Sequence, residues 1–330
     1  MQSLAALFDA HIHLREGELM EKVVPLIKSG GTKAVYVMPN LNAPICHVKD
    51  AIAYRQALEK IDNTIEYYMS LYLSKNITEQ DIIEAKANKV YGVKWYPKGV
   101  TTKSENGISD IKECYHVLKW MENCDLILNI HGEVPFDSNV TVLNAEERFI
   151  PTLFQIRKDF PNLKIVVEHV TTKALVDAVE FLDDRVVATI TLHHLVLTVN
   201  DWAGCSHNFC KPVAKTFEDM EALWSVIKKK SPKFFLGSDS APHLRDHKNA
   251  FKANAGIFTS PILVHYLAHA FEEQGILELL EDFSSTFGKR FYGINKEYGT
   301  IQLEKKDLQI QSNFIVPYFK EGETISYCLK

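Results

Sequence analysis

The feature that most constrains the fold of this chain is a regular alternation between two kinds of segment. Short runs rich in β-branched and aromatic residues are each followed by a longer amphipathic segment. Several runs are apolar almost throughout, as is typical of strands buried on both faces of a parallel sheet. They predict eight strands, near residues 4–12, 33–39, 65–73, 89–96, 125–132, 164–170, 185–191 and 233–239. The amphipathic segments predict eight helices, near residues 18–28, 48–61, 78–87, 110–122, 144–159, 173–181, 217–230 and 261–281.

Eight strand–helix units in strict alternation favour an α/β fold, the closed (β/α)8 barrel of TIM type. An open doubly wound sheet also alternates, but it commonly carries a glycine-rich phosphate turn after its first strand. Here the first strand is followed by His13-Leu-Arg-Glu-Gly17, without a GxGxxG pattern. We therefore predict a single catalytic barrel domain over residues 1–330. The more polar residues 296–330 would form a C-terminal extension packed on the barrel.

The composition and the charge of the chain argue against several classes of protein. The net charge of −5 argues against a nucleic-acid partner. Nothing approaches the ~18 consecutive apolar residues of a membrane span, so no membrane association is expected. The N-terminus lacks the basic start of a signal peptide. The six scattered cysteines form no CxxC pair, which favours reduced thiols. We expect a cytoplasmic protein.

Potential metal ligands stand at the predicted strand ends where barrels of this type carry their active sites. His11 and His13 end the first strand, and as residues i and i+2 they point to the same face. The others come from four further strands and are Lys94, His131, His169 and Asp239. One histidine at a strand end is more often a satisfied polar group than a ligand. Six such residues at one end of a barrel predict a shared metal centre.

Four imidazoles and a carboxylate are too many for one catalytic zinc, which usually takes three protein ligands. They suit two metals ~3.5–4 Å apart that share a bridging hydroxide. Two such cations need an anionic bridge, and we find no further acid at a suitable strand end. A desolvated Lys94 could lose its proton and take up carbon dioxide as a carbamate. From the spacing alone, a barrel lysine paired with an acid is an equally good interpretation.

Six motifs surround these residues: Asp9-Ala-His-Ile-His-Leu-Arg15, Met38-Pro-Asn-Leu41, Val93-Lys-Trp-Tyr-Pro97, Asn129-Ile-His-Gly-Glu133, Val167-Glu-His-Val-Thr-Thr-Lys173 and Leu236-Gly-Ser-Asp-Ser-Ala-Pro-His243. With them the chain resembles the dihydroorotases of the amidohydrolase superfamily, in particular their shorter, free-standing class. HxH alone marks the superfamily, whereas HxHLR together with MPN and GSDSAPH is much more specific. The resemblance covers nearly the whole barrel.

The resemblance implies a ligand set for two zinc ions. His11, His13 and Asp239 would hold the more buried ion, and His131 and His169 the more exposed one. Lys94, modified to N6-carboxylysine, and a hydroxide would bridge them.

The resemblance also implies substrate contacts. Arg15, Asn40 and His243 would bind a carboxylate, for which a guanidinium fork is well suited. The backbone near Ala255 and Gly256 would touch the substrate, as would Thr101 and Thr102 on a mobile lid over residues 98–107. Lys211 is a departure, since relatives often carry an apolar residue where backbone groups touch the pyrimidine ring.

The activity implied is the zinc-dependent, reversible hydrolysis of L-dihydroorotate to N-carbamoyl-L-aspartate in pyrimidine biosynthesis, with Asp239 as the catalytic proton carrier. The partners implied are this small-molecule substrate and a second copy in a homodimer. Two alternatives stay open. A hydantoinase or dihydropyrimidinase would act on substrates without the carboxylate, which leaves Arg15 nothing to bind. A non-catalytic barrel scaffold would be expected to have lost ligands, and this chain has all six.

Overall fold

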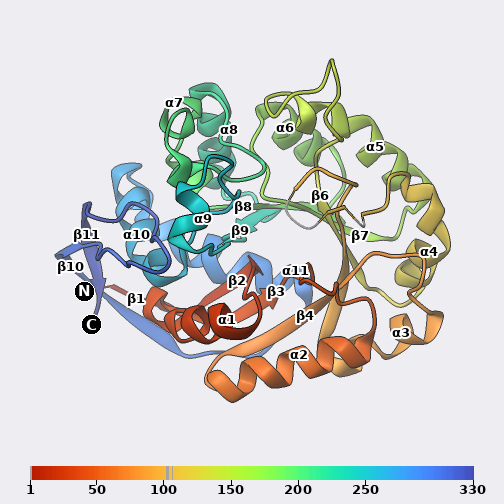
Figure 1. Ribbon diagram of the computed structural model, residues 1–330, viewed down its shortest axis with the longest axis horizontal. Helices are drawn as coiled ribbons and strands as arrows, with labels where there is room; N and C mark the ends of the chain where they lie inside the picture. Colours follow the sequence, from red (N-terminus) through yellow and green to blue (C-terminus); the bar gives the residue numbers. More distant parts are fainter. Residues whose placement is uncertain (1, 102–103, 106) are drawn as a thin grey trace.

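A computed structural model describes residues 2–101, 104–105 and 107–330, and its centre is an eight-stranded parallel sheet curled into a barrel (Figure 1). The strands follow one another in chain order, from β2 to β9. Their bounds are β2 Leu7–Ile12, β3 Thr32–Val37, β4 Glu66–Tyr72, β5 Val90–Trp95, β6 Ile127–His131, β7 Lys164–Glu168, β8 Val186–Ile190 and β9 Phe234–Leu236. The predicted (β/α)8 architecture is confirmed.

The barrel is closed by the residues that follow β9. Ile12 and Ser240 form a parallel bridge. The Asp239 amide donates to the His11 carbonyl over 2.9 Å, and the His13 amide donates to the Ser240 carbonyl over 3.0 Å. Closure therefore brings the end of the first barrel strand and the segment after the last one into direct contact.

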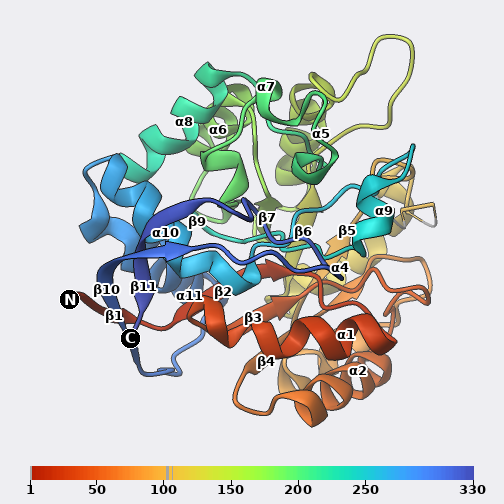
Figure 2. The same ribbon diagram turned by 60° about the vertical axis from the view of Figure 1, so that its left-hand side comes forward.

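Helices surround the sheet on the outside (Figures 1 and 2). Eight of them correspond to predicted segments: α1 Gly17–Val23, α2 Val48–Ile61, α3 Glu79–Glu84, α4 Tyr115–Asn123, α5 Ala145–Asp159, α6 Lys173–Phe181, α8 Phe217–Lys228 and α10 Leu263–Glu273. The single helix predicted over 261–281 is wrong at its end. Gly275 lies in the left-handed region at φ 68°, and the chain turns there before a later helix, α11 Phe287–Tyr292. The short helices α7 Val199–Trp202 and α9 Arg245–Asn249 lie in loops and were not predicted.

The first predicted strand, 4–12, is two strands. β1 (Gln2–Ala5) leaves the barrel and pairs antiparallel with β10 (Thr300–Gln309), which pairs in turn with β11 (Thr324–Leu329). The break falls at Ala6, whose amide donates to the Gly299 carbonyl over 2.9 Å. Both ends of the chain thus share one small sheet at the side of the barrel (Figure 2).

The barrel interior is filled with aromatic side chains at one end. Phe8, Tyr36, Phe235 and Tyr292 belong to one buried cluster, and Tyr292 comes from α11. A larger apolar cluster lies between the strands and the surrounding helices. Among the described residues, no helix is both long and apolar enough to cross a membrane.

Candidate metal centre

Three of the predicted ligands converge where the barrel closes. The Nε2 atoms of His11 and His13 lie 3.2 Å apart. Asp239 Oδ1 lies 3.3 Å from His11 Nε2 and 3.0 Å from His13 Nε2. Two donor atoms bound tetrahedrally to one zinc at ~2.0–2.1 Å are separated by roughly 3.3 Å. This donor set therefore fits a metal ion.

The remaining predicted ligands lie beside this group. His131 ends β6 and His169 follows β7, and their ring centroids are 4.7 Å apart. The His169 ring lies 5.1 Å from the His11 ring, and its buried Nδ1 has no hydrogen-bond partner among the described residues. Lys94, on β5, is fully buried. The structure thus brings all six predicted side chains to one end of the barrel.

Glu168 is a residue that the sequence analysis missed. The Lys94 ammonium donates to its Oε2, and the same oxygen lies 3.0 Å from His11 Nδ1. The expectation that no further acid lies at a suitable strand end is therefore wrong. In a regular strand neighbouring side chains face opposite sides, which would separate Glu168 from His169. His169 instead has φ 46°, in the left-handed region, so the regular alternation ends at this residue. In the structure the unmodified Lys94 is paired with an acid, as the alternative interpretation states.

A second buried carboxylate supports His131. Glu133 Oε2 lies 2.7 Å from His131 Nε2. A carboxylate on one ring nitrogen of a metal-binding histidine orients the ring and leaves the other nitrogen for the metal. Glu133 lies two residues beyond His131, so the spacing offered a signal for it in the sequence.

Burial and the carboxylates set the charges of this cluster. Burial lowers the pKa of His11, but Glu168 and Asp239 outweigh it and raise this pKa to about 9. Burial lowers the pKa of His13 to about 4. Burial would raise the pKa of Asp239, but hydrogen bonds from His11 and His13 hold it well below its usual value. Burial also lowers the pKa of Lys94, against the opposing effect of Glu168. A lowered pKa favours the neutral amine, the form that reacts with carbon dioxide.

A small cavity of about 20 Å³ adjoins five of the six predicted ligands, all except Lys94. Five of the predicted substrate residues line it: Arg15, Asn40, Thr101, Ala255 and Gly256. Thr102 lies outside the described residues. The cavity shares Thr101, Lys211 and Ala255 with a larger, more open one of about 950 Å³. Lys211 is half-buried, with its Nζ 4.8 Å from the centre of the Phe136 ring.

Arg15 and His243 form one polar group beside this cavity. Arg15 Nε donates to the Pro242 carbonyl over 2.9 Å, and one of its terminal nitrogens lies 3.2 Å from His243 Nε2. Asn254 Nδ2 lies 3.3 Å from His243 Nδ1, and the Ala255 carbonyl lies 2.9 Å from Nε2. Burial lowers the pKa of His243 to about 2, so the ring is neutral. The consistent tautomer accepts at Nδ1 and donates from Nε2 to Ala255. The Arg15 guanidinium then keeps an N–H group for an anion.

Comparison with known proteins shows the family to which the chain belongs. The model of the amidohydrolase family matches residues 3–307. A probable dihydroorotase of Schizosaccharomyces pombe is 43% identical over 320 residues, which cover 96% of this chain and 95% of the relative. The crystal structure of a dihydroorotase of Saccharomyces cerevisiae in complex with 5-fluoroorotic acid superimposes with a TM-score of 0.95 at 38% identity, covering 100% of this chain and 99% of that one.

A more distant structure shares the fold alone. An L-hydantoinase of Arthrobacter aurescens has a TM-score of 0.85 at 14% identity, covering 99% of this chain and 82% of that one. The match to the family model extends over most of the chain, and the relatives match nearly all of it. The chain belongs to the amidohydrolase family.

Proposed function

We propose that this chain is a dihydroorotase, which interconverts L-dihydroorotate and N-carbamoyl-L-aspartate in pyrimidine biosynthesis. The observation that carries the proposal is the pairing of Arg15 and His243 beside the six converging side chains. A buried guanidinium in such a cavity needs an anion, and the substrate's carboxylate supplies one. Hydantoin and dihydrouracil, the substrates of the alternative class, lack that carboxylate. The 43% identity to a probable dihydroorotase also supports dihydroorotate over them.

The proposal includes two zinc ions. His11, His13 and Asp239 would hold one and His131 and His169 the other, with Lys94 as N6-carboxylysine supplying a shared carboxylate. When bound, such a metal pair polarises the ring amide carbonyl and makes water a nucleophile near neutral pH. Glu168 contacts the Nδ1 atom of His11, and Glu133 contacts the Nε2 atom of His131. Each carboxylate orients its ring and leaves the other ring nitrogen for the metal.

The chain's own residues supply binding and proton transfer. Arg15, with Asn40 and His243, holds the carboxylate so that the ring amide faces the metal side of the cavity. Asp239 is ionised, because its pKa lies well below the ordinary value. Its carboxylate takes the proton of the attacking water and passes it to the leaving ring nitrogen. In the direction of ring closure the same proton moves back.

The compartment and assembly in this proposal are the cytoplasm and a homodimer. Size-exclusion chromatography coupled to light scattering tests the dimer, and a mass of one chain at working concentration would contradict it. Localisation of a fluorescently tagged chain in its own cell tests the compartment, and a signal confined to another compartment would contradict it.

The experiment that tests the activity is an assay of purified protein with dihydroorotate and with dihydrouracil, each with and without a chelator. We expect turnover of dihydroorotate that the chelator abolishes and added zinc restores. Preferred turnover of dihydrouracil would favour the hydantoinase class. Absence of turnover of both compounds by zinc-loaded protein would favour the non-catalytic scaffold.

A further inference from the structure

A buried lysine outside the metal cluster holds two loops together. Lys248, on α9, is 2% exposed. Its ammonium donates to three backbone carbonyls: Phe209 at 2.9 Å, Asn254 at 3.0 Å and Gly256 at 2.8 Å. An ammonium has three N–H donors, so its hydrogen-bonding capacity is fully used.

The three carbonyls belong to two segments that form walls of the substrate cavity. Phe209 lies two residues before Lys211, and Asn254 and Gly256 flank Ala255. Lys211, Ala255 and Gly256 all line the cavity. The two segments also touch directly, since the Gly256 amide donates to the Phe209 carbonyl over 3.0 Å. The ammonium therefore lies at their junction.

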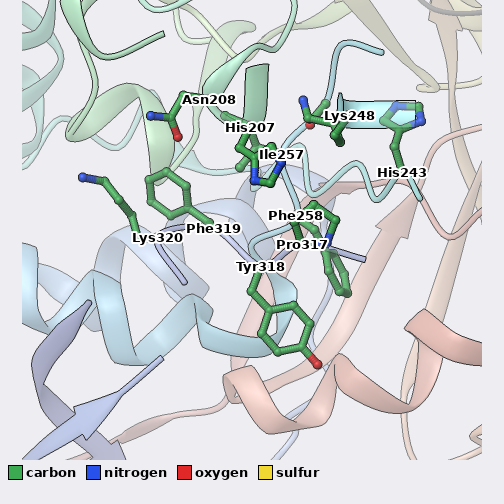
Figure 3. A pocket seen from close by; sticks show the side chains of 11 residues that line it. His207, Asn208, His243, Lys248, Ile257, Phe258, Pro317, Tyr318, Phe319 and Lys320 are labelled. Atoms are coloured by element: carbon green, nitrogen blue, oxygen red, sulfur yellow. The ribbon is translucent and has the colours of Figure 1, made fainter. Parts of the chain in front are cut away.

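The same junction determines the orientation of His243. The His243 ring is bonded at one nitrogen by the Ala255 carbonyl and at the other by the Asn254 amide group. Gly256 has no space for a side chain, because a Cβ there would lie 2.6 Å from the Ala241 carbonyl and 2.9 Å from His243 Nε2, so its backbone packs directly against the His243 ring. Figure 3 shows Lys248 and His243 at a small cavity that Tyr318 and Phe319 also line. A shift of residues 254–256 would thus displace His243.

Among the described residues, Lys248 has no acid partner that would explain its charge. Burial lowers its pKa to about 8, and the titratable groups that act on it are the thiols of Cys210 and Cys205. A buried cation is costly unless it is fully hydrogen-bonded, and here three backbone carbonyls accept its hydrogen bonds. Such an arrangement stabilises the positions of those carbonyls.

We propose that Lys248 is a positioning residue for substrate binding, whose ammonium joins residues 209–211 to residues 254–256 and so holds His243 and the cavity wall in place. The inference rests on the proposed function, because it assigns Lys248 to the binding of dihydroorotate. Lys248 touches neither the substrate cavity nor the reacting atoms, so its effect acts through the two segments.

The test uses variants with a matched control. Lys248→Met keeps the apolar stem and removes all three donors, and Lys248→Gln keeps an amide that donates to at most two carbonyls. The control is Lys233→Met. Lys233 is also buried, and its ammonium donates to the carbonyls of Val179, Glu180 and Leu182. It directly precedes β9, at the opposite end of the barrel from the site.

Two measurements are made on each variant: steady-state kinetics with dihydroorotate, and amide hydrogen exchange of the substrate-free protein. We expect Lys248→Met to raise KM at least about tenfold while kcat falls less, with unchanged metal content. Exchange over residues 209–211 and 254–257 should be at least about tenfold faster, with Lys248→Gln intermediate. Lys233→Met should change neither quantity, although it lowers thermal stability.

Unchanged exchange in both Lys248 variants would overturn the inference, as would an equal rise of KM in Lys233→Met. If Lys248→Met does not fold, Lys248→Gln gives the same comparison at lower amplitude. Failure of the proposed function is seen separately, because the wild-type protein would then not turn over dihydroorotate. The exchange comparison does not depend on that result.

Discussion

At the scale of single residues, Arg15 distinguishes the proposed substrate from its closest rivals. A hydrogen bond to a charged group is worth roughly 1.5–3 kcal/mol, so Arg15→Ala should lower kcat/KM for dihydroorotate by about 10–100-fold. Turnover of dihydrouracil, however slow, should hardly change, because that ring has no carboxylate. Arg15→Lys should recover only part of the loss, since an ammonium lacks the planar fork.

Arg15 also has a structural contact, its hydrogen bond to the Pro242 carbonyl, and the effect of losing this bond must be distinguished from the loss of substrate binding. Loss of that hydrogen bond alone would lower the turnover of dihydroorotate and of dihydrouracil equally, and it would also lower the melting temperature. Equal impairment would therefore assign Arg15 to the loop structure and remove the main support for dihydroorotate.

Lys94 allows a second prediction at this scale. If it supplies a carbamate, Lys94→Ala should lose nearly all activity, Lys94→Arg should not restore it, and short carboxylic acids should restore part. Protein equilibrated with 13C-labelled bicarbonate should show a carbamate signal by NMR that Lys94→Ala lacks. Full activity of Lys94→Ala would leave Lys94 with the role that the structure gives its unmodified form, an ion pair with Glu168.

At the scale of elements, the strands and the ligands on them were predictable because buried parallel strands have a distinctive composition and the side-chain period in a strand is two. The prediction failed where this period is interrupted. Glu168 was missed because the left-handed residue His169 follows it. β1 was missed because only tertiary pairing with β10 separates it from β2. Such pairings are not encoded locally.

The connection between α5 and α6 gives a prediction for pH dependence. Glu146, in the first turn of α5, accepts from the backbone amides of Thr171 and Thr172 just beyond His169. Burial raises its pKa from 4.5 to about 7. A carboxyl group with a raised folded-state pKa contributes stability that is complete below the unfolded pKa and is lost as pH rises through the folded one.

Glu146→Gln removes this titration. Between pH 4.5 and about 7, the stability of the variant relative to the wild type should therefore increase, by up to about 3 kcal/mol in total. Urea unfolding at several pH values measures this difference in the free energy of unfolding. The test is how the difference changes with pH, because the amide also changes the local hydrogen bonds and so adds a contribution that is the same at every pH. A relative stability that is constant across this range would show that Glu146 stays ionised in the folded protein.

At the scale of the whole molecule, the two ends of the chain share a sheet. β1 precedes the first barrel strand, and β10 and β11 belong to the C-terminal segment. The Phe319 amide also donates to the Phe258 carbonyl over 2.9 Å. We propose that residues 1–330 form one domain, with residues 296–330 as an extension of the barrel. Thermal unfolding should then show one transition by calorimetry and by circular dichroism, and two separate transitions would contradict the proposal.

The metal centre should contribute to the stability of the whole barrel, because three of its ligands come from the two segments that meet where the barrel closes and the other three come from β5, β6 and the end of β7. A ligand that binds only the folded state stabilises it by about 2.7 kcal/mol when its concentration is one hundred times Kd. For 330 residues, with about 2.1 cal/mol/K of unfolding entropy per residue, this corresponds to about 4 °C in Tm for each site. Removal of metal by a chelator should lower Tm by at least this amount, and zinc should restore it.

Two histidine variants make this last measurement specific to the site. His13→Ala lacks a predicted ligand, so its Tm should respond less to chelator and zinc than that of the wild type. His269→Ala removes a histidine on α10 that bonds Ser326 in β11, away from the cluster, and should keep the full response. A titration that follows bound zinc and Tm together should show two ions per chain at saturation. If chelator leaves Tm unchanged, or if both variants respond like the wild type, the converging side chains do not hold a metal. Their close approach would then be a feature of barrel closure alone.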